Sequence, residues 1–270
     1  RLINPERFVL MFAPISRTFE ASYDLSGPRR TVPPYVRNRI ALPTELGENL
    51  AFLRGWQEIF SGDSFVYDYP LGRAHYGDLG YVHIAQVIGS DIKKLRQMGL
   101  DGYISCQELR CALPNALPNY VMGHTLLDEG ADTEELIDEY FTAAYGERAG
   151  AVREYLGALS RLSSCDYVNG KGSRTNPDMV RRMEEAVETV RAFASEPGES
   201  LPWRLLAYHG RYVCRMAEAL RRLAMGDRAG GREAWLALRK LITENEREFQ
   251  PCLDVYRVLE VTEKYTGFGA

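Results

Sequence analysis

The chain has 270 residues, with 33 Lys or Arg against 37 Asp or Glu, and therefore a formal net charge of −4. This length suits one large domain or two modest ones, and a composition of 45% hydrophobic and 26% charged residues excludes a disordered chain. No apolar run approaches the ~20 residues that span a bilayer, and no basic stripe stands out, so neither a membrane nor a nucleic acid is an expected partner.

The first half of the chain alternates predicted strands with predicted helices. Short apolar runs bounded by turn residues predict strands over residues 8–12, 65–69, 102–106 and 120–124. The first of these runs is continuous, which is typical of a strand buried on both faces. Apolar residues at three- and four-residue spacing predict helices over 44–60 and 81–98. In the first helix, Leu50, Leu53 and Trp56 share the apolar side.

Strands that alternate with helices indicate βα units with parallel strands. Three or four such units are half of a (β/α)8 barrel, so we interpret residues 1–127 as the C-terminal half of a TIM-type barrel whose N-terminal half is absent. A flavodoxin-like open sheet is the alternative, but no glycine-rich phosphate loop follows the first strand. The open edges of a half barrel would favour pairing with a second copy.

The second half, residues 128–270, carries a helical pattern with almost no strand signal. Asp132 and the pair Asn176-Pro177 are typical helix starts, and Ser200 precedes a third. Their apolar stripes predict the mutual core of a helical bundle.

The five cysteines are scattered and include no C-x-x-C pair, so they support neither a zinc site nor a redox motif. No metal or cofactor is expected. Unpaired thiols favour a reducing compartment such as the cytoplasm, whereas secretion stays open if an export signal precedes Arg1.

Side chains just past the carboxyl ends of barrel strands point into the active site. This rule selects Arg17, Glu20, Tyr23, Asp68, Tyr69, Gln107, Glu108, Arg110 and His124. Carboxylates, arginines and aromatic rings on one rim suit a carbohydrate, and cleavage of a glycosidic bond requires two carboxyl groups. Structural roles stay open: Asp68 could cap a helix or form a surface ion pair, Arg17 could pair with Glu20 or Asp24, and His124 could be a hydrogen-bonded rim or core histidine.

Several segments follow one another in a consistent order: 65–69 (Phe-Val-Tyr-Asp-Tyr), 99–103 with Gln107 and Glu108, 117–121 with 126–128, and 139–141 with 144–146. Together they resemble a bacterial domain-of-unknown-function family, number 4838. That family is similar to the barrel of family 67 α-glucuronidases. The resemblance implies a glycoside hydrolase-like site with Asp68 and Glu108 on its floor. The sequence departs from the family's pattern at Leu127-Asp128, where related proteins often have a Trp-Asp pair.

These observations predict the C-terminal part of a glycoside hydrolase acting on a carbohydrate, including one that bears a uronic acid. Asp68 and Glu108 are the expected catalytic residues, and the other selected side chains are expected to bind substrate. Such barrels usually take their general acid from a middle strand, which would lie in the absent half, so we expect this chain alone to be inactive. The alternative is a non-catalytic carbohydrate-binding or assembly protein on a barrel scaffold.

Overall fold

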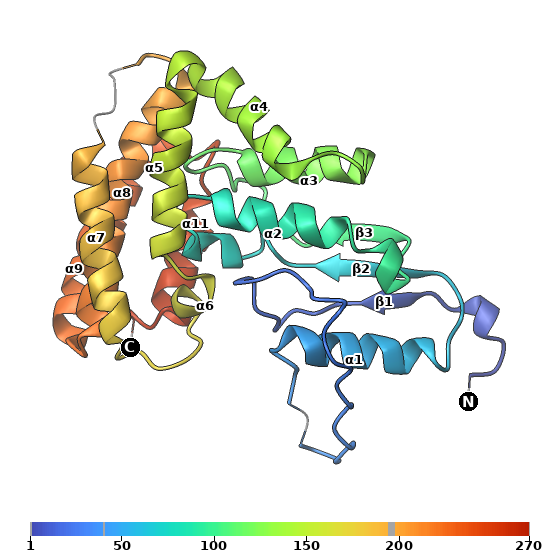
Figure 1. The fold of residues 1–270 in the computed structure, drawn as a ribbon. Coiled ribbons are helices and arrows are strands. Elements are labelled where there is room, and N and C mark those ends of the chain that lie inside the picture. The colour runs from blue at the N-terminus through green and yellow to red at the C-terminus, as the bar shows by residue number, and fades with distance from the viewer. Residues whose placement is uncertain (1, 40, 194–197, 270) are drawn as a thin grey trace.

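The computed structural model describes residues 2–39, 41–193 and 198–269. It contains a parallel sheet whose strands, in spatial order, are β1 (Leu10–Phe12), β2 (Ser64–Asp68) and β3 (Gly102–Ser105) (Figure 1). Asp68 lies opposite Ser105 in the register of β2 and β3. The carboxyl ends of these two strands therefore lie at the same edge of the sheet.

Two helices connect the strands, α1 (Leu46–Gln57) and α2 (Val82–Ile92). Val66 and Tyr103 pack in one cluster with Leu53 of α1, and Tyr103 also packs in the cluster built around α2. Both helices therefore cover the same face of the sheet. On the opposite face, Met11 is 52% and Ile104 47% exposed.

The strand order is sequential and both helices lie on one face, which is compatible with the winding of a barrel, because right-handed crossovers that always move in one direction stay on one side of the sheet. A flavodoxin-like sheet would instead reverse its order after the first strand. The described residues thus form a mixed α/β protein that is mostly helical and contains a small parallel sheet.

The expectation that 8–12 is buried on both faces is wrong. Met11 in the middle of β1 is half exposed, and so are Phe8 and Val9 before the strand. The physical reason is that α1 and α2 cover only one face, and no other described segment covers the second.

The expected fourth strand at 120–124 is also wrong, because these residues lie within helix α3 (Leu117–Leu127). A short apolar run does not distinguish a strand from a buried helix segment. The wider pattern decides here: Leu117, Val121 and Thr125 follow at four-residue spacing, and all three are buried. The helix packs along α2.

The rest of the chain is helical. The helices are α4 (Thr133–Tyr145), α5 (Ala149–Leu162), α6 (Cys165–Val168), α7 (Pro177–Ala192), α8 (Leu201–Ala224), α9 (Arg228–Glu244), α10 (Glu246–Phe249) and α11 (Val255–Glu260). Short helical turns are η1 (Pro5–Arg7), η2 (Ala74–Gly77), η3 (Arg96–Met98), η4 (Gly146–Arg148) and the π-helical η5 (Val261–Tyr265). Two predicted starts are confirmed: Asp132 accepts hydrogen bonds from the N–H groups of the first turn of α4, and Asn176 does so for α7.

The helical part is built around α8, which packs against α7 on one side and α9 on the other (Figure 1). Trp235 of α9 is fully buried, and its indole N–H donates to Thr262 Oγ1 at 3.0 Å. The same core includes Val82 of α2 and Val121 of α3, so it continues into the sheet-bearing half. Among the described residues, no helix combines the length and the apolar character needed to cross a membrane.

Candidate functional site

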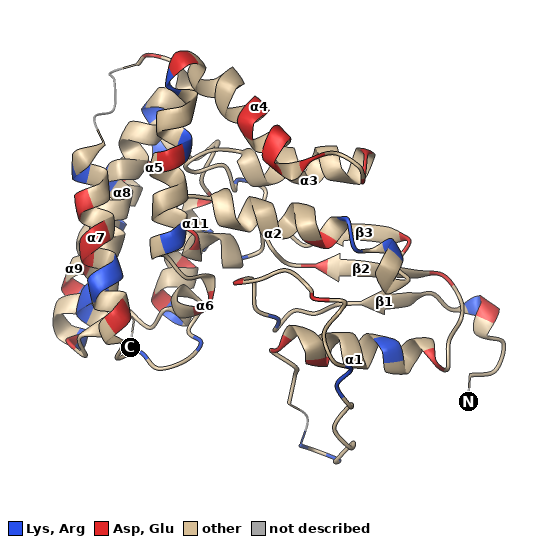
Figure 2. Ribbon diagram, viewed as in Figure 1, with Lys and Arg blue, Asp and Glu red and all other residues tan. Residues whose placement is uncertain are grey.

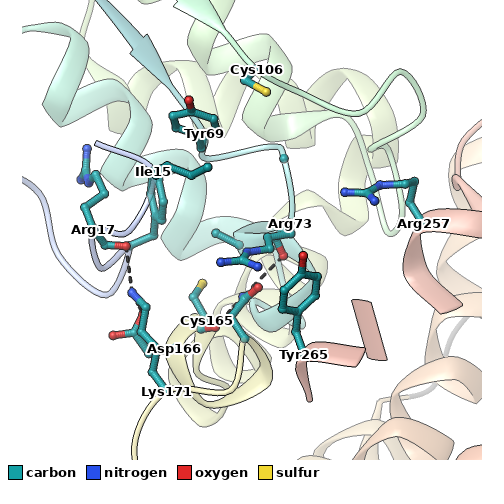
Figure 3. Close-up of a pocket in the computed structure, with 14 residues that line it drawn as sticks. Ile15, Arg17, Tyr69, Arg73, Cys106, Cys165, Asp166, Lys171, Arg257 and Tyr265 are labelled. Carbon is teal, nitrogen blue, oxygen red and sulfur yellow. Dashed lines mark hydrogen bonds and ion pairs between the residues drawn. The ribbon is translucent and has the colours of Figure 1, made fainter. Parts of the chain in front are cut away.

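A cavity of about 240 Å³ lies past the carboxyl ends of the strands (Figure 3). Loops that follow the strands form one wall, and segments of the helical part form the other. The first wall is lined by Ile15, Arg17, Phe19, Tyr69, Gly72, Arg73, Ala74 and Cys106, and the second by Cys165, Asp166, Asn169, Lys171, Arg257 and Tyr265. This is the edge at which parallel α/β sheets bind their ligands.

Arg17 lies at the cavity but is almost completely buried, and its guanidinium is held on every side. It donates to Asp91 Oδ2 at 2.6 Å and to Asp68 Oδ2 at 3.4 Å, and to two backbone carbonyls as well. The rings of Phe19 and Tyr23 face the guanidinium at 4.5 and 4.2 Å from their centroids. Arg17 therefore has a structural role that the proposed pairing with Glu20 did not anticipate.

Asp68 is buried behind Arg17. One carboxylate oxygen accepts the N–H of Tyr69 at 2.9 Å, and the other faces Arg17. Burial raises the pKa of Asp68, and nearby Asp91 raises it further, although Arg17 opposes the shift. The arginine thus compensates part of the cost of burying two carboxylates together.

Glu108 is the centre of a second buried network. Its Oε2 accepts from the Tyr76 hydroxyl at 2.7 Å, and its Oε1 accepts from Arg257 Nε at 3.0 Å. Burial raises the pKa of Glu108, and the hydrogen bonds from Tyr76 and Arg257 oppose that shift. Arg257 also contacts Glu260 through a second nitrogen. The helical part therefore supplies the cation that this carboxylate needs.

Neither predicted catalytic carboxylate lines the cavity. Each is paired instead with an arginine that does, Asp68 with Arg17 and Glu108 with Arg257. The structure thus places both carboxylates at the carboxyl-terminal edge of the sheet, and an arginine lies on the cavity side of each.

Two predicted binding residues have internal roles. Glu20 accepts from the Ser164 hydroxyl at 2.6 Å and from the N–H of Asp166 at 2.8 Å, which fastens the loop after β1 to the start of α6. Tyr23 is buried against Arg17, and its hydroxyl has no hydrogen-bond partner within the described residues.

The other predicted binding residues lie in different surroundings. Tyr69 lines the cavity, and burial raises its pKa. Gln107 is exposed and bonds to Ser105, while Arg110 pairs with Asp254 at 3.1 Å. His124 is exposed on α3, where its ring lies 4.2 Å from that of Tyr120, so the structure does not bring it to the cavity.

Arg73 is one of several cavity residues that the sequence does not predict, and Lys171, Arg257 and Tyr265 are others. Its guanidinium lies over the ring of Tyr265, 4.2 Å from the centroid (Figure 3). Within residues 2–39, 41–193 and 198–269 it has no carboxylate partner and donates no hydrogen bond. Since an arginine carries five N–H donors, this side chain presents an unused donor set to the cavity.

The remaining cavity charges are balanced. Lys171 donates to the carbonyl of Arg17 at 2.8 Å and pairs with Asp166 at 2.9 Å. Arg17 and Arg257 each face two carboxylates. Arg73 is therefore the one cavity-lining cation, in the described part of the chain, whose charge no carboxylate offsets.

Within the described part of the chain, no three His, Cys, Asp or Glu side chains are grouped so that they could hold a metal ion. Comparison of the chain with family models, with curated proteins and with solved structures gives no match. The site therefore has to be interpreted from its own geometry.

Proposed function

We propose that this chain is the C-terminal part of a glycoside hydrolase-like (β/α)8 barrel whose cavity binds the acidic unit of a carbohydrate. The observation that carries the proposal is Arg73, an uncompensated cation on a cavity wall at the strand ends. A guanidinium binds a carboxylate through two parallel N–H bonds, so one such cation matches one uronic acid. The single-direction winding of the sheet supports the barrel.

The rings beside Arg73 suit a sugar. Tyr69 and Tyr265 line the cavity, each with an apolar ring and a polar hydroxyl. Such rings pack against the apolar face of a sugar while their hydroxyl groups bond to its edges. The cavity volume of about 240 Å³ is small, so we expect it to hold a single sugar unit.

In this proposal Asp68 and Glu108 supply the carboxyl groups for cleavage. Burial raises the pKa of both, which is the property that a general acid requires. The second candidate is a carbohydrate-binding protein without catalysis, and the arginine on the cavity side of each carboxylate favours it.

Titration calorimetry with glucuronic acid and glucose tests the binding proposal. We expect glucuronic acid to bind roughly tenfold more tightly or better, because a charge-assisted hydrogen bond contributes about 1.5–3 kcal/mol. Equal or absent binding of both sugars would contradict it.

Turnover of aryl glucuronides then separates the two candidates. The hydrolase proposal expects the barrel assembled with its other half to release the aryl group, and it expects Glu108→Gln to abolish this release while the folded state persists. Binding of glucuronic acid without any turnover, in a barrel assembled with its other half, would support the non-catalytic candidate instead.

A further inference from the structure

The loop between β1 and α1 forms a second groove, on the outer side of α1. Side chains of this loop lie against the helix at two of its glycines: a Cβ at Gly47 would lie 3.1 Å from Arg30 Nε, and one at Gly55 would lie 3.7 Å from Val32 Cγ2. The groove between them has a volume of about 580 Å³. We call it the arginine groove, and the residues that line it include Arg29, Arg30, Arg54, Trp56, Glu58 and Ile59.

The charge of this region is one-sided. No Asp or Glu occurs between Asp24 and Glu45, and this interval holds Arg29, Arg30 and two further arginines. Figure 2 shows the loop below α1 with Lys and Arg colouring and no Asp or Glu colouring along its length. Among the described residues, no carboxylate pairs with an arginine of the groove, where Glu58 is the one acidic side chain.

Trp56 lies in the same groove and is 50% exposed. Its position in the helical spacing predicts burial beside Leu50 and Leu53, which are indeed buried. Ile59, one turn further, is 66% exposed. The helix therefore presents a large aromatic ring to solvent at the point where the arginines gather.

We propose that the arginine groove binds a chain of an acidic polysaccharide, with Trp56 as the platform for a sugar ring and Arg29, Arg30 and Arg54 as partners of its carboxylates. The choice of an acidic glycan rests on the proposed function of the cavity. The positive charge of the groove complements an acidic polymer, and the exposed Trp56 lies among arginines that pair with no carboxylate of the described residues. Tight binding of a nucleic acid rests on many phosphate contacts, and the groove provides three arginines beside one glutamate.

The test uses polygalacturonate as the probe, with an excess of glucuronic acid to occupy the cavity. We expect Trp56→Ala and the double variant Arg30→Gln/Arg54→Gln each to bind the polymer at least tenfold more weakly than the unaltered protein. Binding should also weaken as salt rises, because exposed charges are screened. Arg247→Gln, a change at an exposed arginine of α10, is the matched control and should bind normally.

Binding of glucuronic acid alone separates this inference from the proposed function. Trp56→Ala and the double variant should retain it, and near-native thermal unfolding would exclude a folding defect. Suppose that the unaltered protein binds the polymer but not glucuronic acid, and that the groove variants do not bind the polymer. This result would overturn the cavity proposal but not the groove. Polymer binding unchanged in both groove variants would overturn the groove. Tighter binding of single-stranded DNA than of polygalacturonate would overturn the glycan assignment.

Discussion

Arginine has opposite surroundings in two parts of the molecule, the buried layer behind the cavity and the cavity wall in front of it. The buried layer comprises Arg17, Asp68, His75, Tyr76, Asp91 and Glu108. Arg17 lines the cavity but belongs to the buried layer, because it is almost completely buried, faces Asp68 and Asp91 and donates four hydrogen bonds. Arg73 on the wall lies over Tyr265 with no carboxylate partner among the described residues. The partners of Arg17 show that its role is structural, whereas Arg73 keeps its donors for the ligand that we propose.

The largest expected effect is in the buried layer. Arg17→Met leaves Asp68 and Asp91 buried without their cation, and loss of one partner from a buried ion pair costs about 3–5 kcal/mol. Urea unfolding should show this loss of stability. The matched change Arg73→Met should cost less than about 1 kcal/mol, and equal losses in the two variants would break the comparison.

Acid should weaken the buried layer next. His75 is fully buried, neither of its ring nitrogens has a hydrogen-bond partner in the described residues, and burial lowers its pKa to about 3. Because the unfolded chain binds this proton below about pH 6.5 and the folded state does not, stability falls as the pH drops from about 6.5 towards 3. One such histidine contributes roughly 1.4 kcal/mol per pH unit.

The variant His75→Phe should reduce the slope of unfolding free energy between pH 6 and pH 4 by about that amount per unit. His209 is also buried with a pKa lowered to about 3, so part of the slope should remain. His124→Phe, at an exposed site, is the control and should keep the full slope. An unchanged slope in His75→Phe would remove this histidine from the acid response.

A smaller effect is expected at the second network. Tyr76→Phe deletes the hydroxyl that donates to Glu108, and a hydrogen bond to a charged group is worth about 2 kcal/mol. Tyr265→Phe is the comparison on the cavity wall, and its loss of stability should be clearly smaller. Denaturant unfolding of both variants checks this order, and the reverse order would contradict the assignment of Tyr76 to the buried layer.

Local sequence patterns predict the elements of the sheet well. Three strands and the first connecting helix lie within three residues of their predicted bounds. The second helix, predicted over 81–98, ends at Ile92 and is followed by the short turn η3, and Gly99 after that turn has a left-handed φ of +70°. The prediction of a strand over 120–124 is wrong because a segment of five residues does not define a period. Trp56 was expected on a buried side, but burial depends on what covers the helix, which the spacing does not reveal.

The site was predicted only in part. The strand-end rule finds Arg17, Asp68 and Glu108, but their partners Asp91 and Arg257 come from distant positions that no local pattern connects. Arg73 was missed for the same reason, since Tyr265 is far from it in the chain. The arginines at positions 29, 30, 37 and 39, with no acidic residue among them, indicate a basic surface although they form no continuous stripe in the sequence.

The most direct test of the account measures glucuronic acid binding and thermal unfolding together in Arg73→Gln, with Arg247→Gln as the control. We predict that Arg73→Gln weakens binding at least tenfold, because the carboxylate loses its partner, while its midpoint of unfolding stays near that of the control. Binding as tight as in the control, or a large fall in the unfolding midpoint, would contradict the claim that Arg73 is the ligand-facing cation of the cavity.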